Sequence, residues 1–408
     1  MRQSTRNDRR KIMTLPIAST ALKGIRVIDL SRVRSGPTAV RQFADWGADV
    51  IKIEPPESVE PDGSLGAGRN TADFQNLQRN KRSMTLNLKS EEGIRILKEL
   101  IQTADVVIEN FRPDVKDRLG LDYESLKKLN PRVILGSISG FGQDGPYAKR
   151  PGFDQIAQGM GGLMSITGEP GHGPMRVGIP IADLCAGLFC AMGVLTALLE
   201  RNNSGEGQWV QTSLLQSQIF MLDFQAARWL TQGEIPKQAG NDHPTSIPTG
   251  VFQTINGSIN IACAGEAIWQ RCARALGHPE WVDDPRFLQN ADRSENRQIL
   301  NSMITEVTMK NTSEYWVESL LEAGVPTGPI YTVDQVFADP QVAHLGIATE
   351  ALGTIPFGDT KLVGQPFSMN RTPSSIVSPP PNRGQHTEEI LAELGIVDSE
   401  SLKLDNVI

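Results

Sequence analysis

The sequence contains few of the residues that disulfide scaffolds and metal sites need. The 408 residues include only four cysteines, and no two of them have the CxxC spacing. The five histidines are scattered and form no pair with metal-ligand spacing. We therefore expect reduced cysteines in a protein core, as in cytoplasmic proteins, and no metal site. The cysteines are Cys185, Cys190, Cys263 and Cys272.

An excess of basic residues is also lacking, and so is an apolar leader. A net charge of -7 and a pI near 5.4 argue against a nucleic-acid partner. Residues 1–20 are basic and polar without the apolar core of a secretory signal, so we expect a disordered leader there. The apolar run Leu184 to Leu199 is shorter than the about 20 residues of a membrane span, which argues against a membrane partner. A cytoplasmic enzyme is the expected class.

The first ordered pattern is one βαβ unit from Ile25 to Glu54. A β-branched apolar strand is followed by the turn Ser35-Gly36-Pro37, a helix through Trp46 and a second strand. This order predicts a parallel sheet that binds its ligand at the carboxyl ends of the strands. Because no GxGxxG opens the helix, a dinucleotide-dependent oxidoreductase is disfavoured.

The rest of the chain predicts two domains. Further strands at 104–111 and 131–142 extend the sheet, and an amphipathic helix covers 90–102. A helix is expected near 213–230, and Asn256-Gly257 indicates a hairpin turn. We expect an α/β fold in which a Rossmann-like large domain with a parallel sheet is joined to a smaller α+β domain. The predicted ranges are 21–205 and 330–408 for the large domain, 225–323 for the small domain, and 206–224 and 324–329 for the linkers.

Asp183 is the only charged residue in an apolar stretch from Val177 to Leu199. A carboxylate in such surroundings is costly to bury, so it is either paired from elsewhere in the fold or kept for chemistry. The alternative is structural, because an aspartate at the start of a helix can cap it by accepting backbone N–H bonds.

Several ordered blocks resemble the class III coenzyme A transferase family of the CaiB/BaiF type. They are LKGIRVIDLSRVRSGPTAV, GADVIKIEPP, NKRSMTLNLKSEEG, DVVIENFRPDVKDRLGL, NPRVILGSISGFGQDGPY and IADLCAG. The resemblance covers nearly the whole chain and is nearest to succinyl-CoA-dependent dicarboxylate CoA-transferases. It implies an interlocked homodimer, acyl-CoA and a carboxylic acid as substrates, and no permanently bound cofactor.

The family's catalytic aspartate corresponds to Asp183. The resemblance implies that this carboxylate attacks a donor thioester and then carries CoA as an aspartyl thioester. Asp154 corresponds to a position that can serve as an auxiliary group on the acyl chain. The resemblance also implies a set of residues that bind CoA: Arg34, Ser35, Leu86, Lys89, Asn110, Phe111, Arg112, Arg118 and Phe153.

Three alternatives and the identity of the acids remain open. The family includes 2-methylacyl-CoA racemases, but Phe153 stands where a racemase has a histidine before the aspartate. Formyl-CoA:oxalate transferases have a glycine-rich loop in the small domain, and no GGGG occurs here. A non-catalytic CoA-binding protein is the third alternative. Recognition of a second carboxylate needs an arginine or equivalent donors, and the candidates by position are Arg34, Arg176 and Arg228.

Overall fold

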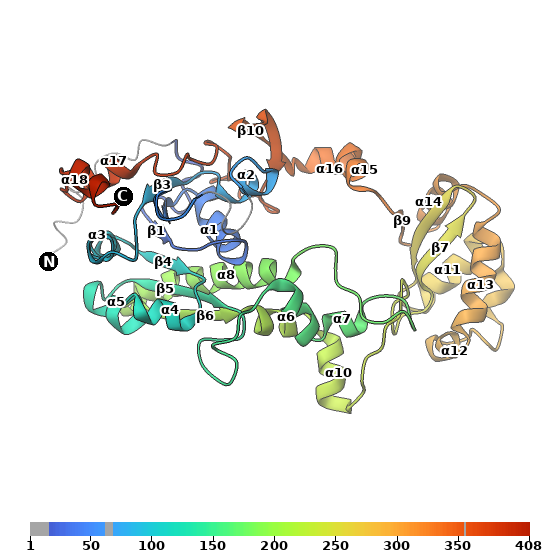
Figure 1. Cartoon of the computed structure of the whole chain (residues 1–408). Coiled ribbons are helices and arrows are strands. Elements are labelled where there is room, and N and C mark those ends of the chain that lie inside the picture. The colour runs from blue at the N-terminus through green and yellow to red at the C-terminus, as the bar shows by residue number, and fades with distance from the viewer. Residues whose placement is uncertain (1–15, 62–67, 355) are drawn as a thin grey trace. The chain divides into compact units, whose positions relative to one another are not determined.

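A computed structural model of the chain describes residues 16–61, 68–354 and 356–408. Contacts between residues divide the chain into two compact units. The first contains the described residues through Leu163 together with Val177–Ala227 and Ala343–Ile408, and the second contains Met164–Arg176 and Arg228–Val342. Figure 1 shows the elements of both units along the chain.

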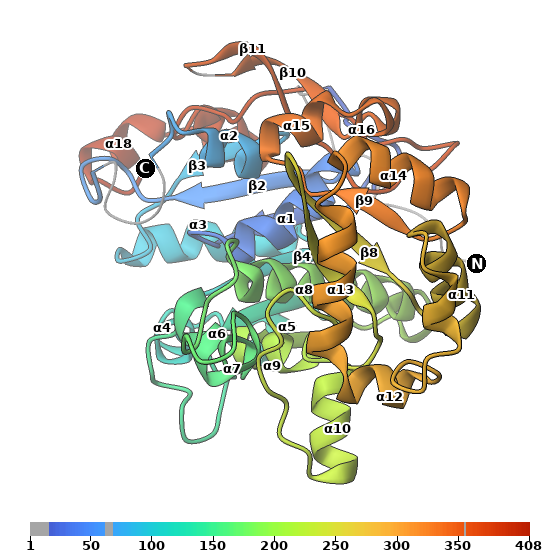
Figure 2. The same cartoon turned by 90° about the vertical axis from the view of Figure 1, so that its right-hand side faces the viewer.

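The first unit is built on a six-stranded sheet in the order β3-β2-β1-β4-β5-β6, with every neighbouring pair parallel. This is the strand order of doubly wound nucleotide-binding folds, so the prediction of a Rossmann-like parallel sheet is confirmed. Figure 2 shows β2 and β3 side by side. The strands are β1 (Arg26–Asp29), β2 (Asp49–Glu54), β3 (Arg82–Thr85), β4 (Val106–Glu109), β5 (Ile134–Ser139) and β6 (Trp209–Ser213).

Successive residues of the strands point to opposite faces of the sheet, and both faces are buried. Val27 and Val106 belong to one core, with residues of α1 (Ser35–Asp45) and α8 (Ile181–Ser204). Ile28 and Val107 belong to the other, with residues of α3 (Glu91–Gln102). A parallel sheet needs such cover on both sides, which explains why the inner strands β1 and β4 have apolar residues on both faces.

Helix α8 is long and apolar enough to cross a membrane by length and composition alone. In the structure it packs against α1 and β5, and half of its most apolar stretch is buried. Core helices of globular proteins can have the same length and apolar composition. The close approach of α1 and α8 depends on Gly187, because a Cβ there would lie 2.5 Å from the carbonyl oxygen of Ser35.

The second unit contains an antiparallel sheet in the order β7-β8-β9 and a separate apolar core. Trp269, Phe252 and Phe287 are fully buried in that core. Antiparallel strands with helices agree with the predicted small α+β domain. Its elements are β7 (Thr249–Thr254), β8 (Gly257–Ala262), α11 (Glu266–Ala275), η1 (Pro279–Val282), α12 (Asn290–Glu295), α13 (Arg297–Thr308), α14 (Ser313–Glu322), β9 (Thr327–Pro329) and α15 (Val333–Ala338), and the unit ends within α16 (Pro340–Leu345).

The remaining elements belong to the first unit, except that α7 and α10 each cross a unit boundary along the chain. β10 and β11 form a two-stranded antiparallel sheet. The bounds are α2 (Ala72–Gln78), α4 (Pro113–Arg118), α5 (Tyr123–Leu129), α6 (Asp154–Met160), α7 (Leu163–Ile166), α9 (Leu214–Phe220), α10 (Phe224–Gln232), β10 (Ala348–Thr354), β11 (Gly358–Val363), α17 (Thr387–Glu393) and α18 (Ser399–Leu404).

Several of the predicted domain ranges differ from the two units. Residues 164–176 and 330–342 fall in the second unit, whereas the sequence pattern assigns them to the large domain. The predicted linkers are parts of the two units, because 206–224 contains β6 of the first sheet and 324–329 contains β9 of the second. The side chain of Gln238 fixes the first segment by donating to the carbonyl oxygens of Thr167 (2.7 Å) and Gly173 (2.6 Å). The predicted leader lies outside the described residues up to position 15, but its end is ordered: Ala18 and Ser19 are buried. The Ser19 hydroxyl donates to the Thr372 carbonyl oxygen at 3.1 Å.

Candidate active site

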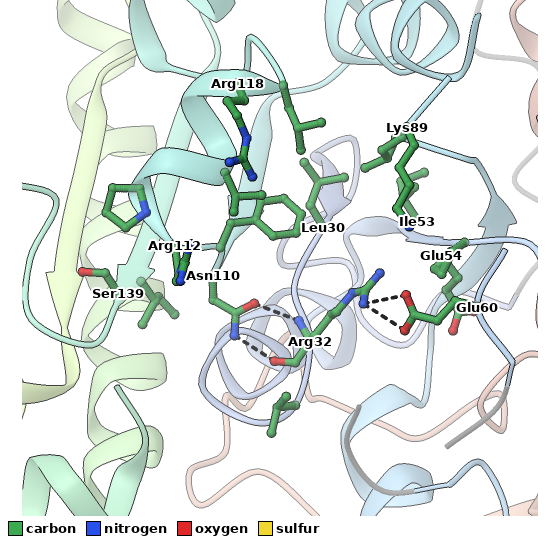
Figure 3. Close-up of a pocket in the computed structure, with 18 of the residues that line it drawn as sticks. Leu30, Arg32, Ile53, Glu54, Glu60, Lys89, Asn110, Arg112, Arg118 and Ser139 are labelled. Atoms are coloured by element: carbon green, nitrogen blue, oxygen red, sulfur yellow. Dashed lines mark hydrogen bonds and ion pairs between the residues drawn. The ribbon is translucent and has the colours of Figure 1, made fainter. Parts of the chain in front are cut away.

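A cavity of about 1280 Å³ opens at the carboxyl ends of β1, β2, β4 and β5. This is where a parallel sheet is expected to bind a ligand. Its lining includes Asp183 and every residue that the sequence resemblance assigns to CoA. The structure therefore brings these side chains, which are far apart in the sequence, to one place. Figure 3 shows part of this lining, with Lys89, Asn110, Arg112 and Arg118 among the labelled residues.

Asp183 lies in the first turn of α8 and is partly buried. Burial is the main reason why the pKa of its carboxyl is raised to about 6, and the nearby Asp154 carboxylate raises it further. The charge of Arg34 and a hydrogen bond from the Ser35 hydroxyl act in the opposite direction. The carboxylate is thus ionised at neutral pH but incompletely hydrated.

Asp154 caps α8, so Asp183 is not the residue that does so. Asp154 Oδ1 accepts the backbone N–H of Ala182 at 2.9 Å and that of Asp183 at 3.4 Å. Its Oδ2 accepts from Gln158 Nε2 at 2.7 Å, and Gln158 Oε1 accepts the backbone N–H of Val177 at 3.0 Å. Asp154 is buried and is not among the residues that line the cavity. Its contacts are those of a group that positions the start of α8.

A buried ion pair holds the loop that follows β1. Asp29 accepts hydrogen bonds from the backbone N–H and the hydroxyl of Ser31, at 2.9 and 2.5 Å, and from Lys81 Nζ at 3.0 Å. Burial alone would raise the pKa of Asp29, but the charges of Lys81 and Lys52 outweigh it and lower this pKa. Gly36 completes the turn, because a Cβ there would lie 2.1 Å from Ser31 Cβ.

Asn110 ties the end of β4 to the same loop. Its side-chain oxygen accepts the backbone N–H of Arg32 at 2.8 Å, and its amide donates to the Arg32 carbonyl oxygen at 2.8 Å. Both bonds are drawn in Figure 3. The two predicted CoA-binding residues Asn110 and Ser35 are also joined, at 3.4 Å. The loop before α1 is therefore held firmly beside the cavity.

Basic side chains are frequent in the cavity wall, and several have carboxylate partners. Arg34 forms a bidentate pair with Asp73, at 2.9 and 2.6 Å. Arg32 pairs with both carboxylate oxygens of Glu60, each at 2.9 Å. Arg112 and Arg118 both contact Asp114, at 3.0 and 3.6 Å. The ends of Arg112, Arg118 and Lys89 are exposed at the cavity and available to an anionic ligand.

The sequence analysis missed the carboxylate partners of these arginines. Asp73 lies in α2 and Glu60 in the loop after β2, and neither stands in a motif that identifies it. Glu54, at the end of β2, accepts from Arg69 at 2.5 Å and from the Ser83 hydroxyl at 2.6 Å. The only available signal was the position of Glu54 at a strand end, where parallel sheets collect polar groups.

Two of the three candidates for a second-carboxylate site belong to the second unit. Arg176 is exposed, and Arg228 is paired with Glu234. Only Arg34 lines the cavity of the first unit. Phe153, at the position where a racemase has histidine, also lines that cavity and is 61% exposed.

No group of three or more His, Cys, Asp or Glu side chains is placed to hold a metal ion within residues 16–61, 68–354 and 356–408. The four cysteines are all buried and free. The cavity's chemistry therefore rests, among the described residues, on a partly buried carboxylate, hydroxyl and amide groups and basic side chains.

An α/β fold with a carboxylate beside a basic cavity suits enzymes that act on anionic thioesters, and comparison with known proteins identifies the family. The model of CoA-transferase family III matches residues 22–387. The chain belongs to this family and is an enzyme that transfers CoA.

Individual relatives agree with this assignment. The chain is 38% identical to a succinate–glutarate CoA-transferase of Agrobacterium fabrum, over 94% of this chain and 98% of the relative. It is 37% identical to an acetyl-CoA:oxalate CoA-transferase of Acetobacter aceti, over 84% of this chain and 89% of the relative. A crystal structure of a CaiB/BaiF family protein from Brucella suis has a TM-score of 0.79 and 36% identity, covering 92% of this chain and 100% of that one.

Proposed function

We propose that this enzyme moves CoA from succinyl-CoA to a dicarboxylic acid, with the Asp183 carboxylate as the group that carries CoA. The observation that supports the proposal most is the position of Asp183. It is a partly buried carboxylate at the cavity, held at the start of α8 beside Ser35 and Arg34. Loss of hydration strengthens a carboxylate nucleophile, which is otherwise weak in water.

The chemistry proceeds through two mixed anhydrides. An Asp183 oxygen attacks the donor carbonyl, the carbon–sulfur bond breaks, and CoA leaves as its thiolate. The thiolate attacks the Asp183 carbonyl of the anhydride, which releases the donor acid and leaves an aspartyl-CoA thioester. An acceptor carboxylate then displaces the thiolate, and the thiolate attacks the acceptor carbonyl to form the new acyl-CoA and free Asp183. No net proton is gained or lost, so the enzyme needs a carboxylate rather than an acid–base pair.

The choice of donor and acceptor rests on relatives. The Agrobacterium fabrum relative is described as a succinate–glutarate CoA-transferase, and it matches almost the whole chain. The Acetobacter aceti relative is described as acting on oxalate, which is also a dicarboxylate. Both names favour a dicarboxylic acceptor, and the first favours a succinyl donor.

A racemase and a simple CoA-binding protein predict different results. With Phe153 at the cavity, the position that carries a histidine in racemases cannot exchange a proton. Incubation of the enzyme with 2-methylacyl-CoA in deuterium oxide should therefore leave the α-hydrogen in place. Incubation with succinyl-CoA and a panel of dicarboxylic acids should produce free succinate and a new acyl-CoA. Exchange without transfer would support a racemase, and neither reaction would support a binding protein.

Oxygen tracing tests the anhydride steps. When the acceptor carboxyl is labelled with oxygen-18, the bridging oxygen of the second anhydride stays on Asp183. After turnover, the peptide containing Asp183 should carry the label, and a second turnover should pass it to succinate. Label that remains entirely in the acyl-CoA product would contradict the proposed sequence of steps.

Assembly and location are further parts of the proposal. We expect a homodimer in which the two chains interlock, located in the cytoplasm. Light scattering on the purified protein should give twice the chain mass of 44.6 kDa. A monomeric mass at micromolar concentration would contradict the expected dimer.

A further inference from the structure

A cation beside the proposed nucleophile is held by a carboxylate of the protein itself. Arg34 lines the cavity, and both of its terminal nitrogens bind the two carboxylate oxygens of Asp73, at 2.9 and 2.6 Å. This fork geometry is the one in which arginine binds any carboxylate. The next residue, Ser35, hydrogen-bonds to Asp183, and the carboxyl of Asp183 responds to the charge of Arg34. The pair therefore lies within electrostatic reach of the reacting group.

From this arrangement we propose that Arg34 is the residue that recognises the second carboxylate of a dicarboxylic acceptor, and that Asp73 occupies its guanidinium until the acceptor displaces it. The inference rests on the proposed CoA transfer and adds the residue that selects the acid. One carboxylate of the acceptor must reach the aspartyl thioester on Asp183. Its other carboxylate then needs a cation nearby, or it remains unpaired in a partly dry cavity.

The exposure of the two partners makes the exchange feasible. The side chains of Arg34 and Asp73 are 28% and 34% exposed, so neither is locked in the core. A pair that is this exposed contributes little to stability, and water can take over the displaced Asp73 carboxylate.

Arg32 provides a matched comparison in the same loop. Its side chain is 35% exposed, forms a similar pair with Glu60 and also lines the cavity (Figure 3). The Glu60 segment is anchored as well, because Arg383 donates to the Glu60 carbonyl oxygen at 2.6 Å. The pKa of Asp183 shows an influence of Arg34 but none of Arg32. Arg34 is thus the better placed of the two for an acid that reacts at Asp183.

The experiment compares acids that differ only in the second carboxylate. Rates of CoA transfer from succinyl-CoA are measured with glutarate and adipate, and with valerate and hexanoate as monocarboxylates of the same chain lengths. Arg34→Gln should lower the ratio of kcat/KM for dicarboxylate over monocarboxylate by about 10-fold to 100-fold, the range of a lost charge-assisted hydrogen bond. Asp73→Asn should lower KM for the dicarboxylates and leave the monocarboxylates unchanged. Arg32→Gln should leave the ratio as it is in the wild type.

One result would contradict the role of Arg34, and a different one would contradict the proposed function. If Arg34→Gln slows both kinds of acid equally while its melting temperature is unchanged, Arg34 acts on Asp183 or CoA and the inference fails, although CoA transfer stands. If the wild type transfers CoA to no acid, the proposed function fails. Calorimetric titration of glutarate into the enzyme with CoA present then tests the inference alone. Binding that Arg34→Gln abolishes and Arg32→Gln preserves would support it, and binding that survives Arg34→Gln, or no binding to the wild type, would overturn it.

Discussion

The protonation state of Asp183 sets the pH range in which the proposed chemistry operates. Burial, reinforced by Asp154, raises the pKa of this carboxyl to about 6. Only the ionised form is a nucleophile, so kcat/KM should fall about tenfold per pH unit below pH 6 and level off above it. Initial rates between pH 5 and 8, with a donor that is stable in that range, measure the profile. A flat profile from pH 5 to 7 would contradict a reacting carboxylate with this pKa.

Asp154 offers a way to move that profile without touching the nucleophile. Asp154→Asn removes a negative charge that raises the pKa of Asp183, and it retains an oxygen that can accept the N–H of Ala182. The acid limb of the kcat/KM profile should therefore shift to lower pH, with a smaller change in the rate at pH 8. A purely structural role for Asp154 would lower the rate at every pH and leave the midpoint of the limb unchanged.

At the residue scale, the sequence singled out Asp183, the proposed reacting group, but not its surroundings. Asp183 stands out because a lone carboxylate in an apolar stretch is costly, and the structure places it at the cavity. The capping of α8 by Asp154 was not predictable, because it joins residues 28 positions apart through the packing of α6 against α8. The ion-pair partner of Arg34 was not predictable either, since Asp73 is an ordinary acidic residue at the start of a short helix.

At the scale of elements, the contact between α1 and α8 positions Ser35 relative to Asp183. An alanine at position 187 would place its Cβ 2.5 Å from the Ser35 carbonyl oxygen and 2.8 Å from Thr38 Cβ. The two helices would have to move apart, so Gly187→Ala should lower the free energy of unfolding by about 1–3 kcal/mol. It should also lower kcat, because the loop before α1 moves with the helix.

Thermal or denaturant unfolding of Gly187→Ala, together with its kcat, tests this packing argument. Thr196→Ala in the same helix is the control, because Thr196 is exposed and its hydroxyl bonds only within the helix, to the Met192 carbonyl oxygen. The control should retain both stability and activity within about 0.5 kcal/mol and about twofold. A Gly187→Ala variant as stable and active as the control would show that the helices do not depend on this close approach.

Two secondary-structure elements differ from the sequence prediction, because backbone conformation or side-chain polarity outweighed the hydrophobic pattern. The helix expected near 213–230 is divided into α9 and α10, because Asp223 adopts a positive φ of 47° between them. Strand β3 was not predicted, since its sequence RSMT is mostly polar. It is buried all the same, because Arg82 bonds to Asp49 and Glu393 and the Ser83 hydroxyl bonds to Glu54. Polar strands of this kind depend on partners that the sequence does not reveal.

At the scale of the whole molecule, a net charge of -7 is combined with a cavity whose wall has many basic side chains. Such focusing draws an anionic ligand into the cavity, and salt weakens it. The Kd for CoA should therefore rise with ionic strength, and Lys89→Ala should raise it about threefold to tenfold at low salt and reduce its salt dependence. Calorimetry at two salt concentrations measures both effects.

Lys361→Ala is the control for the CoA-binding prediction. Lys361 lies on β11, is exposed and is paired with Glu350, and it does not line the cavity. The same net charge is removed from the protein, but the Kd for CoA and its salt dependence should be those of the wild type. Equal effects of the two substitutions would indicate that overall charge, rather than the cavity, governs binding.

The two-unit organisation was predictable in outline. Alternating strands and helices indicated the parallel sheet, and the hairpin pattern indicated the second sheet. The sequence pattern assigns residues 164–176 to the large domain because they adjoin it in sequence. Gln238, which donates hydrogen bonds to this segment, belongs to the second unit. Sequence patterns report periodicity within a segment, but they carry no information on which distant segment it will bind.

The central claim is that Asp183 carries CoA covalently, and mass spectrometry tests it most directly. The enzyme is incubated with succinyl-CoA in the absence of acceptor, acid-quenched and digested, beside an Asp183→Asn control. We predict a CoA adduct on the peptide that contains Asp183, absent from the control and discharged when a dicarboxylic acid is added before quenching. An enzyme that transfers CoA at full rate with no adduct at Asp183, or with an adduct on another residue, would contradict the account.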